Sequence, residues 1–188
     1  MKLHCITLHN IKSLQGTYLL NLDERFGDSE LFLIHGQTGI GKTTIFDAVA
    51  LSLFGQTPKL NGGAQGEGTN SVGWVMNELS GECWTELIFS ILEPSGERKY
   101  YQARWELHRA GKKANGAIQH VKRKLYRLDE HFNLQTVLIE SKVGKEYTPI
   151  FSQALHGMTY EDFQQTILLP QNGFTQFIEA AESERTIL

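Results

Sequence analysis

The residues best suited to chemistry in this sequence are the eight at positions 36–43, which read Gly-Gln-Thr-Gly-Ile-Gly-Lys-Thr. They fit the spacing G-x-x-x-x-G-K-[ST] at every fixed position. Glycines let a backbone approach a ligand closely, and the backbone N–H groups can then converge on one anion. The lysine adds a mobile positive charge. The pattern predicts a phosphate loop for a nucleotide, made of Gly36, Gln37, Thr38, Gly39, Ile40, Gly41, Lys42 and Thr43.

The segments on both sides have the patterns that such a loop needs. Residues 30–35 form a short apolar run, which predicts a buried central strand. Residues 43–54 repeat apolar residues at helical spacing, and Gly55 stands where helices usually end. A helix starting there points its positive dipole end at the phosphates. The Thr43 hydroxyl would then hold Mg²⁺, and Thr44 would reach the α-phosphate.

The rest of the chain shows mostly alternating apolar and polar residues, which predicts strands. The alternation predicts an opening strand over 3–9, a turn over 10–13 and a returning strand over 17–22. Further strands are expected over 83–92, 101–108, 121–128 and 136–140, with a hairpin tip at 111–116. Helical patterns cover 160–168 and begin again at 176. The fold class is therefore α/β, with much of the sheet antiparallel.

The composition is that of an ordinary globular domain. Of the 188 residues, 40% are hydrophobic and 21% are charged, and no apolar run is long enough to span a bilayer. The N-terminus lacks the apolar run of a signal peptide. Cys5 and Cys83 have no metal-ligand or catalytic spacing, and we expect both to be reduced, semi-buried thiols. The cytoplasm is the expected compartment.

The charge is distributed unevenly along the chain. Residues 98–127 contain ten Lys and Arg residues and one acid, a local charge of +9, although the whole chain carries −3. A basic segment of this kind favours a polyanionic partner such as DNA. An alternative is a solvated edge strand on which lysines oppose aggregation. The candidate DNA contacts at the hairpin tip and on its arms are Arg109, Lys112, Lys113, Lys122 and Lys124, and Arg123 is expected on the same arms.

A series of motifs resembles a known family. It includes Met-Lys-Leu at the start, the segment 9–16, the phosphate loop and Phe-Asp-Ala-Val at 46–49. This series is similar to the SbcC family of double-strand-break-repair ATPases, which is related to SMC proteins. Residues 166–178 resemble that family's Q-loop, and residues 184–188 resemble the start of the helix that leads into its coiled coil.

The resemblance implies the N-terminal lobe of an ABC-type P-loop ATPase head, with a mixed or antiparallel sheet around the P-loop helix. In this family the head is split, and a C-terminal half supplies the signature motif and the Walker B carboxylates. Gln171 would touch Mg²⁺ and the attacking water, and Lys12 and Ser13 would sit near the phosphates or ribose. The family often has Arg where Lys12 stands.

The implied partners are the C-terminal half, a second head around two ATP molecules, an SbcD-type nuclease and DNA, in a bacterial, nucleoid-associated setting. We expect this chain to bind ATP and to hydrolyse it only when the C-terminal half complements it.

Two segments only imitate the missing motifs: residues 79–82 lack the second signature glycine, and Arg127 interrupts the Walker-B-like run 125–130. We interpret the first as a turn and the second as a strand followed by a turn.

Two other functions stay open at this point. One is an SMC-like ATPase that tethers chromosomes without a nuclease partner. The other is the nucleotide-binding domain of a membrane transporter, which the long stretch between Lys42 and Gln171 disfavours.

Overall fold

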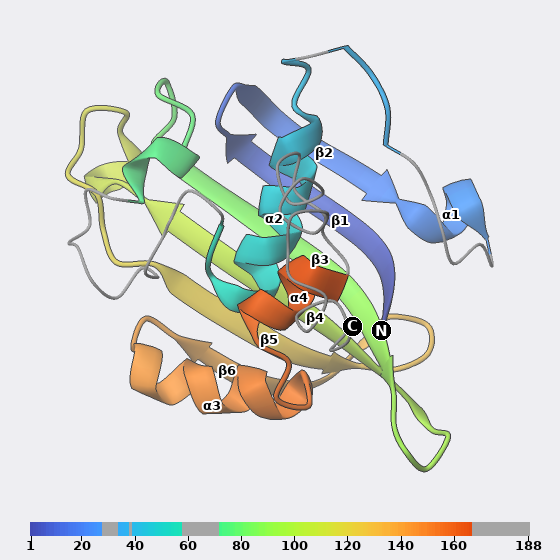
Figure 1. Ribbon diagram of the computed structural model, residues 1–188. Coiled ribbons are helices and arrows are strands. Elements are labelled where there is room, and N and C mark those ends of the chain that lie inside the picture. Colours follow the sequence, from blue (N-terminus) through green and yellow to red (C-terminus); the bar gives the residue numbers. More distant parts are fainter. Residues whose placement is uncertain (28–33, 38, 58–71, 167–188) are drawn as a thin grey trace, which may run out of the picture.

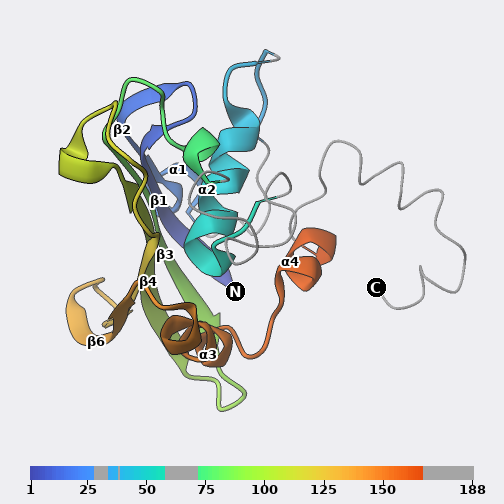
Figure 2. The same cartoon turned by 90° about the vertical axis from the view of Figure 1, so that its left-hand side faces the viewer.

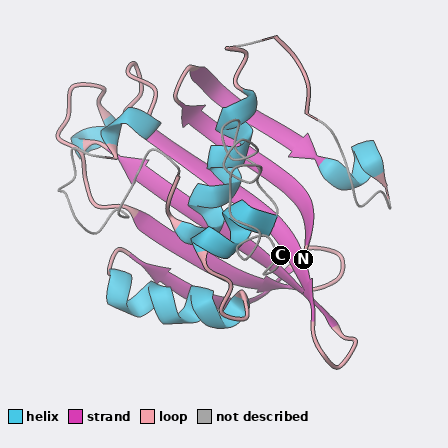
Figure 3. Ribbon diagram, viewed as in Figure 1, coloured by secondary structure: helices cyan, strands magenta, loops and turns pink. Residues whose placement is uncertain are grey.

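The computed structural model describes residues 1–27, 34–37, 39–57 and 72–166. Within these ranges, six strands form one antiparallel sheet in the order β2-β1-β3-β4-β5-β6 (Figures 1 and 3). The strands are β1 (Lys2–Ile11), β2 (Leu14–Asn21), β3 (Glu82–Leu92), β4 (Arg98–His108), β5 (Lys122–Leu128) and β6 (Leu134–Ser141). This order confirms the strands expected over 3–9, 17–22, 83–92, 101–108, 121–128 and 136–140, each within a few residues.

One helix, α2 (Lys42–Phe54), packs on the centre of one sheet face. Its buried residues form a continuous run from Asp47 to Leu53, so the helix is enclosed on nearly every side. Alternate residues of β3 and β4, such as Leu87, Ala103 and Trp105, are fully buried on the sheet. This alternation is what a strand with one core face requires. Figure 2 shows the sheet edge-on, with α2, α3 and α4 on the same side.

Besides two short 3₁₀ helices at 73–75 and 110–112, the described fold has three further α-helices. They are α1 (Leu22–Phe26), α3 (Gly144–Ala154) and α4 (Tyr160–Thr166). The expected helix over 160–168 is confirmed as far as Thr166. No prediction covers α3, which carries Pro149 inside it. It forms because its apolar residues, including Phe151 and Ala154, bury against the core, and tertiary packing outweighs the missing backbone donor of proline.

The two imitation motifs have the predicted local structures. Residues 79–82 begin inside a turn, which the bond from Ser80 N–H to the Asn77 carbonyl closes, and end at the first residue of β3. The run 125–130 is the end of β5 followed by a turn at Asp129. Both cysteines are free, and burial raises the pKa of the Cys83 thiol. The expected strand over 30–35 lies mostly outside the described residues, and its described end, at Ile34 and His35, is not in a strand.

Candidate nucleotide-binding site

The last two residues of the phosphate loop, Lys42 and Thr43, are the first two residues of α2. Gly39 and Gly41 have φ angles of 87° and 96°, in the left-handed region that favours glycine. Gly41 is the N-cap of α2, and no side chain caps this end. The first turn of the helix also contains no acidic residue. The N-terminus therefore presents its positive dipole end without a neutralising group of its own.

Lys42 is positioned by the loop that it follows. Its Nζ atom donates to the backbone carbonyls of Gly36 and Gln37, at 2.7 Å each. The ammonium group is thus held over the loop by weak, exchangeable acceptors and has no carboxylate partner among the described residues. A cation in this position can transfer to phosphate oxygens, which accept stronger, charge-assisted hydrogen bonds.

The exposure of the loop fits a bound polyphosphate. Gly36, Gln37, Gly39, Ile40 and Thr43 are all exposed, whereas Thr44 is buried. An accessible Thr43 hydroxyl fits the expected Mg²⁺ ligand, because Mg²⁺ commonly takes few protein ligands and completes its shell with phosphates and water. The described residues contain no cluster of His, Cys, Asp or Glu that could hold a metal without the nucleotide. Thr38 lies outside them.

The turn between β1 and β2 lies beside the loop. A side-chain carbon added at Gly41 would lie 3.6 Å from Leu14 Cδ2, so the turn packs directly against the helix N-terminus. Ser13 is exposed in this turn. Lys12 instead directs its ammonium group to the Asp47 carboxylate, which is buried on α2. Asp47 was not among the predicted site residues, although an acid on the buried side of an apolar helix is a signal for such a partner.

The basic hairpin is less positive in the structure than along the sequence. Lys112 pairs with Glu82 at 2.7 Å, Lys122 with Glu140 at 2.9 Å, and Lys124 with Glu106 at 3.1 Å. The Arg109 guanidinium donates to the Gly116 carbonyl at 3.2 Å and holds the hairpin itself. Lys113 is exposed and has no ionic partner among the described residues. Two of these acids, Glu82 and Glu140, come from strands outside the basic stretch, and the third, Glu106, is the single acid within it.

Arg123 does not lie on the exposed arm where the sequence analysis placed it. It is 4% exposed, and its Nη2 donates to the carbonyls of Ser52 and Leu53 at 3.0 and 2.7 Å, at the C-terminal end of α2. Its guanidinium lies 3.7 Å from the centre of the Phe151 ring. Burial lowers the pKa of Arg123 to about 9, so the group is charged at neutral pH. The expectation was wrong because β5 turns this side chain toward the core.

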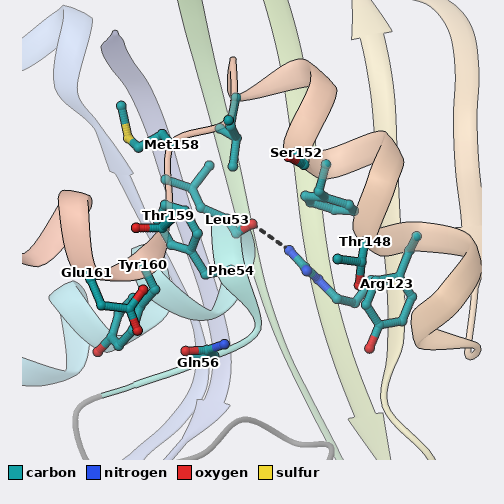
Figure 4. A pocket seen from close by; sticks show the side chains of 14 residues that line it. Leu53, Phe54, Gln56, Arg123, Thr148, Ser152, Met158, Thr159, Tyr160 and Glu161 are labelled. Carbon is teal, nitrogen blue, oxygen red and sulfur yellow. Dashed lines mark hydrogen bonds between the residues drawn. The ribbon is translucent and has the colours of Figure 1, made fainter.

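Figure 4 shows Arg123 reaching from β5 toward Leu53, between α2 and α3. The space beside it is a pocket of about 340 Å³. The Arg123 guanidinium therefore caps the C-terminal end of α2, because it satisfies two backbone carbonyls that have no partner within the helix. The remaining predicted site residue, Gln171, lies outside the described residues, as do residues 176–188.

Comparison with known proteins decides the family. Residues 5–186 match the family described as AAA domain. The chain belongs to this family. It is 33% identical over 202 residues to the SbcC subunit of nuclease SbcCD from Pseudomonas aeruginosa, and 30% identical over 201 residues to the corresponding protein of Rhodobacter capsulatus. Each alignment covers 100% of this chain but only 16% and 15% of the relative, so the chain spans about a sixth of those proteins.

The fold has a counterpart among solved structures. A chain from a study of ATP-driven dimerization and DNA-stimulated activation of SMC ATPases superposes with a TM-score of 0.60 at 16% identity, covering 100% of this chain and 97% of that one. The resemblance to an SbcC-like N-terminal ATPase segment is thereby confirmed, as is the head fold. Membership of a P-loop ATPase family implies nucleotide binding. None of the described helices is long and apolar enough to cross a membrane.

Proposed function

We propose that this chain binds ATP with Mg²⁺ through residues 36–44, as the N-terminal part of the ATPase head of an SbcC-type protein. The observation that carries the proposal is the combination at one point of an uncapped helix N-terminus and the Lys42 ammonium group, whose only acceptors among the described residues are two loop carbonyls. ATP would supply the negatively charged phosphates that the loop cradles, and Mg²⁺ would neutralise part of that charge. The chain's own part is to bind, orient and neutralise the phosphates.

The wider role in this proposal rests on the relatives named as the SbcC subunit of nuclease SbcCD. A C-terminal half would complete the site, two heads would close around two ATP molecules, and an SbcD-type nuclease would process DNA ends in the bacterial cytoplasm. In this proposal Gln171 orients the attacking water and touches Mg²⁺. Hydrolysis depends on the C-terminal half, because a glutamine cannot accept the proton of that water.

The test is calorimetric titration with ATP and Mg²⁺. Lys42→Ala should weaken binding roughly ten- to hundredfold, because a charge-assisted bond to phosphate is lost. Its thermal unfolding should change little, since Lys42 bonds only to exposed loop carbonyls. Lys145→Ala removes an exposed lysine from α3 and should bind like wild type. Equal affinity in Lys42→Ala and wild type would refute the nucleotide site.

The DNA part of the proposal assigns the basic hairpin to the phosphate backbone. Replacing Lys112, Lys113, Lys122 and Lys124 with Ala should flatten the salt dependence of duplex binding, by roughly 0.9 in log–log slope for each phosphate that is no longer neutralised. Because three of these lysines are paired with acids, Lys113→Ala alone should account for a large share of the change. Arg25→Ala, an exposed cation on α1, is the control. An unchanged slope in the quadruple variant would leave the lysines as a solvated edge.

A further inference from the structure

The turn between β1 and β2 is strained and firmly clamped. Asn10 and Lys12 both have φ angles of 52°, which non-glycine residues seldom adopt. The Lys12 N–H donates to the Val75 carbonyl at 2.8 Å, and Asn77 Nδ2 donates to the Lys12 carbonyl at 2.7 Å. The turn and the short 3₁₀ helix η1 (Gly73–Val75) are therefore one unit. Strain that is held in place in this way is typical of functional sites.

This unit is attached to the phosphate-loop helix at two points. Leu14 packs against Gly41, the N-cap of α2. The Lys12 ammonium group pairs with the Asp47 carboxylate, which is 3% exposed. Asp47 comes five residues after Lys42, roughly 7.5 Å along the helix axis. The unit thus lies alongside the first turns of the helix, next to the predicted phosphate site.

Trp74 is the exposed aromatic residue of this unit. Its neighbours Val72, Val75 and Met76 are 4%, 0% and 2% exposed, but Trp74 is 36% exposed. Lys12 Nζ lies 4.6 Å from the centre of the indole ring. The same ammonium group is neutralised by Asp47, so it is not free to serve mainly as a phosphate ligand. The contact instead orients a large flat side chain that leaves much of its surface open to solvent.

We infer that Trp74 is the residue against which the base of the bound nucleotide stacks, with Asp47 and Lys12 as positioning residues that hold the indole. The inference rests on the proposed nucleotide site and extends it to the base. A flat, open aromatic face beside a phosphate loop suits a base, since every base presents a π-face for stacking. A purine base offers a larger stacking area than a pyrimidine, so the bases of ATP and GTP should both stack on Trp74.

The test separates the base from the phosphates by titrating ATP and inorganic triphosphate in parallel, each with Mg²⁺. Trp74→Ala should weaken ATP binding roughly five- to hundredfold, which is the range for loss of one base–aromatic stack. It should leave triphosphate binding unchanged. Trp74→Phe keeps an aromatic ring and should recover most of the ATP affinity. A single-tryptophan protein, with Trp84 and Trp105 changed to Phe, should show quenching by ATP and none by triphosphate.

Trp84→Ala is the matched control. Trp84 also lies under a cation, with Arg104 Cζ 4.0 Å from its ring centre, but its neighbour Thr85 bonds to Ser52 of α2, so Trp84 points to the opposite face. This variant should bind both ligands like wild type. Unchanged ATP affinity in Trp74→Ala, or equal losses for ATP and triphosphate, would overturn the inference. Failure of the wild-type chain to bind either ligand would overturn the proposed function itself.

Discussion

The two ends of α2 are arranged in opposite ways. At the N-terminus, Gly41 provides no capping side chain, and the loop before it is exposed. At the C-terminus, Gly55 N–H donates to the Leu51 carbonyl at 2.9 Å, and Arg123 Nη2 bonds the next two carbonyls. Both ends leave backbone groups without helical partners. The fold satisfies the carbonyls of residues 51–53 at the C-terminus, whereas at the N-terminus, among the described residues, Thr44 is the one of the first three residues whose N–H has a partner, the Gly41 carbonyl.

This difference explains why Arg123, which has no carboxylate partner in the part of the chain that the structure describes, can be buried in the core. The C-terminal carbonyls carry the negative end of the helix dipole, and the Phe151 ring offers its negative face to the same guanidinium. At the C-terminal end of α2, these protein groups therefore compensate the positive charge of Arg123. At the near end, the compensation is left to the phosphates that Lys42 and the loop would bind. Cations that look alike in the sequence thus differ in what they bind.

The largest expected effect on stability comes from a change at the C-terminal end of α2. Arg123→Ala should lower the free energy of unfolding by about 2–4 kcal/mol, because two buried carbonyls lose a charged donor and a cavity replaces the side chain. Arg123→Lys should lose less, since the charge remains but the forked donor does not. Urea denaturation with an unchanged m-value would measure both.

The difference between the two ends of α2 also predicts the ATP affinity of Arg123→Ala. Under conditions where the variant is folded, its ATP affinity should equal that of wild type, because the change lies at the opposite end of α2 from the loop. Arg127→Ala, at a half-buried position in the same strand, should lose clearly less stability. A loss of ATP affinity as large as that of Lys42→Ala would show that the two ends do not act separately.

Much of this architecture could be predicted from local pattern. Alternation over most of β3 and β4 predicts strands that are buried on one face, and the apolar spacing of 43–54 predicts α2 within one residue. The phosphate loop could be predicted because its chemistry depends on residues that are adjacent in the chain. The P-loop family could be predicted for the same reason.

The rest depends on contacts between distant residues. The partners Lys12 and Asp47 are 35 residues apart, and Arg123 and Leu53 are 70 apart. The alternation of β5 places Arg123 on the apolar face, but its charge suggested solvent, and only the helix end that it caps resolves the conflict. Likewise the acids that pair with Lys112 and Lys122 lie in other strands, so the local charge of +9 overstated the exposed positive charge.

A smaller and more selective effect should come from the two glycines that bound the helix. Gly41 has a φ angle of 96° and Gly55 one of 71°, and an added Cβ would make only ordinary contacts, at 3.6 Å from Leu14 and 3.5 Å from Arg123. Gly41→Ala and Gly55→Ala should therefore each cost about 1–2 kcal/mol of stability through backbone strain alone. Chemical denaturation should find the two variants similar.

Their ATP affinities should separate them. In Gly41→Ala the strained backbone and the new methyl group lie where the loop must approach the phosphates closely, so binding should fall at least roughly tenfold. In Gly55→Ala the same strain is placed at an end that is already satisfied inside the protein, so binding should stay at the wild-type level. Titration of both variants with ATP and Mg²⁺ decides the matter. Equal losses would mean that any strain in α2 reaches the loop, and the two ends would then be one mechanical unit.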